Sequence, residues 1–107
     1  MGFDAYLRIA GRTVTIRLGG ELDATTAPVL RSLIDRAKDH DPTRLVLEMG
    51  DLTYMSSAGI RCLVFAHQTL TPAAEIVLLD PQPDVAEVVR LAGLDRAVTL
   101  AESERSR

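Results

Sequence analysis

Two adjacent serines, Ser56 and Ser57, are the side chains of this 107-residue chain best placed for chemistry, because they stand directly before an apolar segment of helical length. A serine hydroxyl at a helix N-terminus can accept a hydrogen bond from a free N–H of the first turn, and such a cap alone explains its presence. The alternative is a nucleophile, which needs further residues around it.

A nucleophilic Ser57 would need a base within hydrogen-bond reach and an acid to orient that base. His40 lies in a polar turn, and His67 follows Ser57 by about 15 Å of helix, so neither reaches it. No Gly-x-Ser-x-Gly motif surrounds Ser57. The lone Cys62 excludes an internal disulfide and a multi-thiolate metal site, and we expect it to be a small core side chain. We therefore predict no enzymatic activity, no metal and no cofactor.

The composition excludes further classes of function. The chain has 12 Lys and Arg against 15 Asp and Glu, a net charge of −3, so no basic surplus is available to neutralise a nucleic-acid backbone. No apolar stretch approaches the length of a membrane span. An apolar content of 47% predicts one globular domain, over residues 1–101, followed by a disordered polar tail over residues 102–107. A single cysteine fits a reducing cytoplasm.

The first half of the chain predicts a hairpin, a helix and a strand. Apolar residues alternate with polar ones over residues 3–9 and 14–18, which predicts two strands, and Gly11-Arg12 between them suits a type II′ turn. Residues 19–23 are predicted to be a loop. A helix follows, with Pro28 in its first turn and Thr25 or Thr26 as its cap. Its apolar stripe has helical spacing and consists of Leu30, Leu33, Ile34 and Ala37.

The second half predicts the remaining strands and helices. Residues 45–49 form a strand, and residues 51–63 run from its end, through a short loop, into the helix that Ser56-Ser57 precedes. Residues 76–79 and 97–100 predict two more strands, and the helix between them ends at Gly93. Strands that alternate with helices over short connections imply right-handed parallel crossovers. We therefore expect an α/β fold, a mixed four- to five-stranded sheet with helices mainly on one face.

The helix after Ser57 is apolar in nearly every direction, so part of its surface must be covered. Core packing is the preferred explanation, and the alternative is an apolar edge near Ile60 and Val64 that is left open for a partner. Gly59 likewise has two interpretations. A residue without Cβ lets the backbone of another molecule approach, or it allows the helix to pack within the chain.

Two motifs carry a resemblance to a known family. Gly20-Glu21-Leu22-Asp23 before a helix, and residues 51–60 (DLTYMSSAGI) running into the next helix, resemble the anti-sigma factor antagonists of bacteria, which are built on a STAS domain. The resemblance covers essentially the whole chain and implies the STAS fold. It also implies a cytoplasmic protein-protein switch in which the antagonist binds an anti-sigma factor that is a serine kinase, and so releases a sigma factor.

The resemblance also implies the residues of the switch. The kinase phosphorylates a serine at the start of the second helix, and a serine phosphatase restores it. That acceptor falls on Ser57, with Ser56 as the second choice because it replaces the usual aspartate. A phosphate there would suit the helix N-terminus and would be repelled by Asp23. The residues expected to contact the partner are Glu21, Asp23, Ser56, Ser57, Gly59 and Ile60.

Two other functions are compatible with a STAS domain. Such a domain can be an accessory subunit of an ABC-type lipid transporter or a scaffold module of a stress complex. Neighbouring genes for a serine kinase and a sigma factor would favour the switch, and transporter genes would favour the accessory subunit. The exposed face of the opening hairpin is a possible surface for a homodimer.

Overall fold

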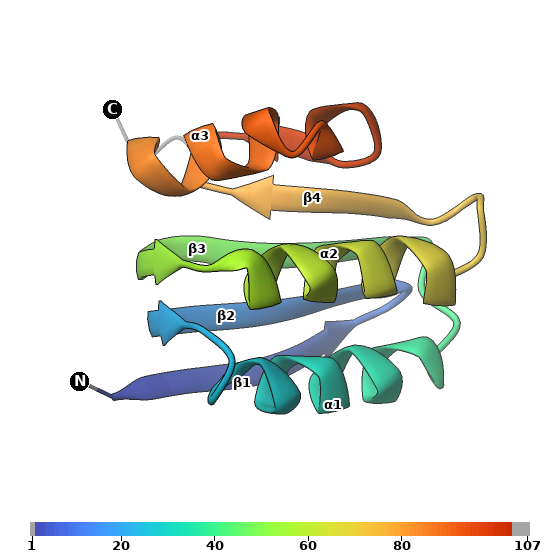
Figure 1. Cartoon of the computed structure of the whole chain (residues 1–107). Helices are drawn as coiled ribbons and strands as arrows, with labels where there is room; N and C mark the ends of the chain where they lie inside the picture. Colours follow the sequence, from blue (N-terminus) through green and yellow to red (C-terminus); the bar gives the residue numbers. More distant parts are fainter. Residues whose placement is uncertain (1, 104–107) are drawn as a thin grey trace.

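The computed structural model of the chain describes residues 2–103. The strands are β1 (Phe3–Ala10), β2 (Thr13–Leu22), β3 (Arg44–Met55), β4 (Glu75–Leu79) and β5 (Thr99–Ala101). The helices are α1 (Ala27–Lys38), α2 (Ser57–Thr69) and α3 (Pro83–Leu91), and a short 3-10 helix, η1 (Leu94–Arg96), follows α3 (Figure 1).

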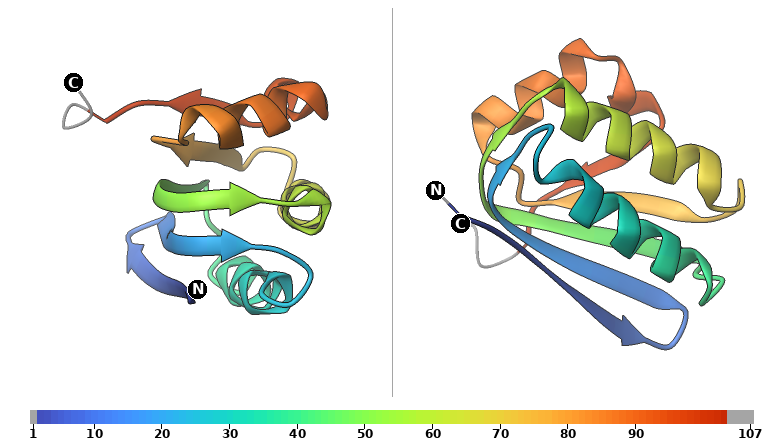
Figure 2. Two further views of the ribbon diagram at one scale, coloured as in Figure 1. Left: turned by 60° about the vertical axis from the view of Figure 1, so that its left-hand side comes forward. Right: turned by 60° about the horizontal axis from the view of Figure 1, so that its bottom comes forward.

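The strands form one mixed sheet in the order β1-β2-β3-β4-β5. β1 is antiparallel to β2, and every other neighbouring pair is parallel. The three helices cover one face of the sheet and leave the other face open (Figure 2). The predicted fold class is confirmed, with five strands.

The opening hairpin has the predicted turn. Ala10 pairs with Thr13, so the loop between β1 and β2 contains only Gly11 and Arg12. Gly11 has a φ of 61°, and Arg12 is not among the residues with positive φ, as a type II′ turn requires. The end of α3 is also as predicted, since Gly93 adopts the left-handed conformation with a φ of 78°.

Two predicted loops are wrong, because β2 and β3 are longer than expected. Residues 19–22 belong to β2 and pair with β3, in which no loop separates Met49 from Met55. The glycines do not end the strand. The pairing shifts its register on either side of Gly19-Gly20, and Gly20 takes a φ of 94°, so these glycines accommodate an irregularity within a continuous strand.

The last strand also begins later than expected. Residues 97 and 98 follow η1, and β5 begins at Thr99. Ser103, within the predicted tail, donates hydrogen bonds to the Asp80 carboxylate from its N–H and its hydroxyl, both at 2.7 Å. The rest of that tail, residues 104–107, lies outside the described residues.

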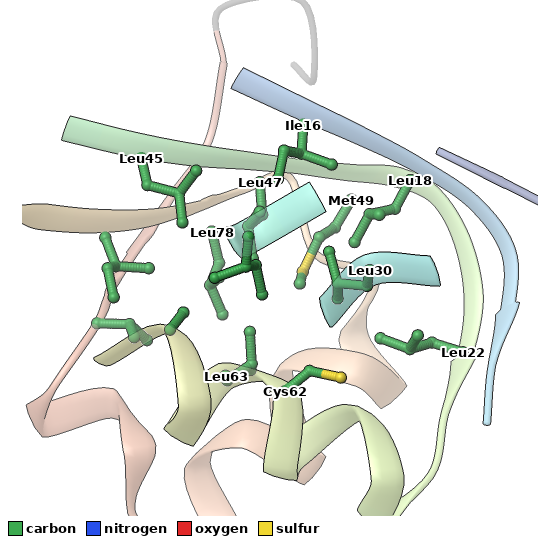
Figure 3. Packing of buried hydrophobic residues seen from close by; sticks show 14 of the residues in the cluster. Ile16, Leu18, Leu22, Leu30, Leu45, Leu47, Met49, Cys62, Leu63 and Leu78 are labelled. Atoms are coloured by element: carbon green, nitrogen blue, oxygen red, sulfur yellow. The ribbon is translucent and has the colours of Figure 1, made fainter. Parts of the chain in front are cut away.

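The core lies between the sheet and the helices (Figure 3). The helix α1 buries Leu30, Ile34 and Ala37 of its predicted stripe, and Leu33 is half-buried. Cys62 is 2% exposed and lies within this cluster, which confirms it as a core side chain. The sheet contributes fully buried side chains from its three central strands: Val14, Ile16, Leu18, Leu45, Leu47, Met49 and Leu78.

Candidate functional site

The candidate site lies where β2 and β3 end. The two strands are parallel, so both end at the same edge of the sheet. From there β2 leads to α1 and β3 leads to α2. Glu21 pairs with Tyr54, and the Ser56 N–H donates to the Leu22 carbonyl at 2.9 Å. This pairing brings Glu21 and Asp23 beside the start of α2, where the predicted phosphoacceptor stands.

Asp23 is fixed in the turn between β2 and α1. Its Oδ1 accepts hydrogen bonds from the N–H groups of Thr25 at 2.9 Å and Thr26 at 3.1 Å. Thr26 is the N-cap residue, but its hydroxyl does not cap the helix and instead donates to the Glu21 carbonyl at 2.8 Å. The predicted threonine side-chain cap is therefore wrong, because this hydroxyl ties the turn to the end of β2.

The two serines have different roles at the start of α2. Ser56 is the N-cap residue in an extended conformation, and its hydroxyl accepts a hydrogen bond from the Ala58 N–H at 3.1 Å, which confirms the expected cap. Ser57 is the first residue of α2 and its side chain is exposed. Within residues 2–103, the hydroxyl of Ser57 takes part in no hydrogen bond. Of the two hydroxyls, that of Ser57 is the accessible one.

Gly59 is explained by packing within the chain. A Cβ at this position would lie 2.5 Å from Cγ of Met55 and 2.9 Å from Cδ2 of Leu22, and both of these side chains are buried. The glycine thus allows α2 to lie close to the ends of β2 and β3. Ile60 and Val64 are half-buried and Ile60 packs against the core, so this edge of α2 is neither fully covered nor fully open.

Three exposed side chains near this site were not selected from the sequence. Tyr54 is 51% exposed at the end of β3, and the alternation of β3 could have indicated its outward position. Arg61 is exposed four residues after Ser57, a helical spacing that the sequence already shows. Arg31 comes from α1, and only the packing of α1 against α2 brings it here.

The residues considered for other chemistry lie away from Ser57. His40 is exposed in the turn after α1, and His67 is exposed in the last turn of α2, about 15 Å along the helix from Ser57. Within residues 2–103, no three side chains of the His, Cys, Asp and Glu types gather where they could hold a metal ion. None of the described helices has the length and apolar character that crossing a membrane needs.

Comparison with known proteins decides the family. The STAS domain model matches residues 5–106. The candidate anti-sigma factor antagonist BtrV of Bordetella bronchiseptica is 32% identical over 90 residues, which cover 83% of this chain and 78% of BtrV. The chain belongs to the anti-sigma factor antagonists of the STAS-domain family.

Solved structures agree with this assignment. An anti-sigma factor antagonist from Mycobacterium paratuberculosis has the same fold, with a TM-score of 0.88 at 20% identity over 98% of this chain and 90% of that one. Unphosphorylated SpoIIAA, an anti-sigma factor antagonist, gives a TM-score of 0.81 at 29% identity over 96% and 91% of the two chains. The phosphorylated form of SpoIIAA, a Bacillus cell fate determinant, gives a TM-score of 0.73 at 28% identity over 96% of this chain and 95% of that one. The family consists of non-enzymatic regulators that act on anti-sigma factors.

Proposed function

We propose that this antagonist binds an anti-sigma factor with serine kinase activity through the surface around Ser57, and that phosphorylation of Ser57 ends the complex. The observation that carries this proposal is the accessible Ser57 hydroxyl at the first position of α2, next to a serine whose own hydroxyl is engaged in the cap. Binding of the unmodified form would release a sigma factor in the cytoplasm, and a serine phosphatase would restore that form.

The start of α2 suits a phosphate group without loss of the fold. The positive end of the helix dipole favours a negative charge there. A phosphate would add about −1.5 to −2 charges at this point. Because Ser57 is exposed, the modified side chain has no packing to disrupt. We therefore expect the phosphorylated protein to remain folded and to differ mainly at its surface.

The same phosphate would change the surface that the partner meets. Asp23 and Glu21 already place two carboxylates at this edge of the sheet, and both side chains are half-buried. An added phosphate would be repelled by them and by any acidic group of the partner. Disruption of one buried, charge-assisted contact at an interface costs about 2 to 5 kcal/mol, which is enough to turn a micromolar complex into a negligible one.

The test is phosphorylation by the anti-sigma kinases encoded in the same genome. Each purified kinase is incubated with the chain and Mg-ATP, and the modified residue is located by mass spectrometry. We expect one phosphate on Ser57, its loss in Ser57→Ala, and its retention in the matched control Ser56→Ala. Phosphorylation by none of these kinases, or at a residue other than Ser57, would overturn the proposal.

A further inference from the structure

A groove of about 210 Å³ lies between α1 and α2, beside the start of α2. On the side of α1 it is lined by Ala24, Ala27 and Pro28, and on the side of α2 by Ala58 and Cys62. Since these side chains are short, the two helices leave a hollow here. The groove adjoins the predicted phosphoacceptor, because Ala58 directly follows Ser57.

Two arginines, Arg31 and Arg61, complete this lining, and we call the whole the arginine groove. The guanidinium carbon of Arg31 lies 4.2 Å from the ring centroid of Phe65, a residue of α2, so Arg31 extends from α1 onto α2. Such a contact between a cation and an aromatic ring holds the guanidinium in place while its N–H groups stay free to donate.

Among residues 2–103, no carboxylate forms an ion pair with either arginine. All the ion pairs found within residues 2–103 belong to other arginines. Asp35, one helical turn after Arg31, is not within ion-pair distance of it. Four other cations of the described residues are also in no ion pair, but they stand in the last turns of α1, α3 and η1, where helix carbonyls favour a cation: Arg36, Lys38, Arg90 and Arg96.

Arg31 and Arg61, by contrast, lie in the N-terminal halves of their helices. Each is the fifth residue of its helix, just past the first turn, so the carbonyls at the end of the helix do not favour its charge. Both charges act within the groove, because they oppose the rise that burial causes in the pKa of the Cys62 thiol. The arginine groove is therefore a hollow with uncompensated positive charge, open at the surface beside Ser57.

We propose that the arginine groove receives an aspartate or glutamate side chain of the anti-sigma factor, recognised by Arg31 and Arg61. This inference rests on the proposed function and identifies the chemistry of its interface. A guanidinium binds a carboxylate through two parallel hydrogen bonds, and the short side chains of the groove leave room for it. A phosphate on Ser57, four residues before Arg61 on α2, would compete with that carboxylate for Arg61.

The experiment measures binding of the unphosphorylated chain to the anti-sigma kinase that phosphorylates it, by calorimetry with ADP in place of ATP. We expect Arg31→Glu and Arg61→Glu each to weaken binding at least about 30-fold, since each places a like charge before the partner's carboxylate. Arg61→Lys keeps the charge without the paired donors. Its affinity for the kinase should lie between that of the two glutamate variants and that of the wild type. Arg90→Glu, the same charge change on α3, is the matched control and should change binding less than about threefold.

Two further measurements keep the result interpretable. Thermal unfolding by circular dichroism should show that Arg61→Glu remains folded, because Arg61 is exposed and forms no ion pair within residues 2–103. The affinity of the wild type should fall more steeply with salt than that of Arg61→Gln. The inference is overturned, and the proposed function stands, if the kinase binds and phosphorylates the wild type while Arg31→Glu and Arg61→Glu bind as tightly as Arg90→Glu does. If no kinase binds the wild type, both are overturned.

Discussion

The arginines of the open sheet face and those of the arginine groove differ in what they bond to. On the open face, Arg8 reaches Glu48 of β3 at 3.4 Å and Arg17 reaches Asp51 at 2.9 Å, so each charge is matched within the chain. The hydrogen bond to Asp51 also raises the pKa of Arg17. Arg31 and Arg61 are not matched within the described residues. The difference separates charges that connect strands from charges that remain available to a second molecule.

The largest expected effect concerns Ser57 beside the groove. Ser57→Asp places a carboxylate near Arg61 and Asp23, and we expect it to weaken the complex with the anti-sigma kinase at least about 30-fold, while Ser57→Ala retains the complex. Calorimetry on the purified proteins measures both. Arg17→Glu, on the open face, is the control and should bind as the wild type does. Tighter binding by Ser57→Asp than by Ser57→Ala would reject the charge argument.

A smaller effect is expected from substitution of a glycine in α2, and a glycine in β2 serves for comparison. In Gly59→Ala the new Cβ would press against Met55 and Leu22, and overpacking of this kind costs about 1 to 3 kcal/mol. Alanine regains up to about 1 kcal/mol of helix propensity, so we expect a net loss of about 1 to 2 kcal/mol in the free energy of unfolding. Denaturant titration measures it.

Gly19→Ala is the matched control on the sheet. Its Cβ would lie 2.7 Å from Oδ1 of Asp4, the end of an exposed side chain that can turn away. We therefore expect its free energy of unfolding to change by less than about 1 kcal/mol. Equal losses in the two variants would contradict the packing role assigned to Gly59.

The smallest expected effect is a change in the pKa of the Cys62 thiol, which lines the arginine groove. Burial raises its pKa, and the charges of Arg31 and Arg61 act against that rise. Arg61→Gln should therefore raise the thiol pKa further, and Arg17→Gln should leave it unchanged, as measured by the ultraviolet absorbance of the thiolate against pH. No difference between the two variants would show that the groove charges do not reach Cys62.

The raised pKa of Cys62 also predicts a dependence of stability on pH. When the pKa of a thiol is higher in the folded state than in the unfolded state, its contribution to stability is complete only at a pH below the pKa of the unfolded state. Stability is therefore lost as the pH rises through the two pKa values. In Cys62→Ala we expect this alkaline loss to be smaller.

Features decided by neighbouring residues could be predicted from the sequence. The turn at Gly11-Arg12, the Ser56 cap and the end of α3 at Gly93 each depend on a few adjacent residues with defined conformational preferences. The continuation of β2 through Gly19-Gly20 could not be predicted in the same way. Two glycines favour a loop by themselves, and only the pairing with Asp4 on one side and Asp51 on the other keeps them in the sheet.

The candidate site was predicted only in part for the same reason. The sequence places Ser57 at a helix start, and the parallel pairing of β2 and β3 then brings Asp23 to it. Arg61 could have been predicted from the sequence, because it stands at helical spacing from Ser57. Arg31 was not, because its place in the groove depends on how α1 packs against α2 and on its contact with Phe65.

The most direct test of the account is the affinity of the chain for its anti-sigma kinase before and after phosphorylation. The chain is phosphorylated by that kinase, the form modified at Ser57 alone is purified, and the two dissociation constants are measured by calorimetry. We expect the phosphorylated form to bind at least about 30-fold more weakly while its circular dichroism spectrum stays unchanged. Equal affinities of the two folded forms would contradict the switch at Ser57.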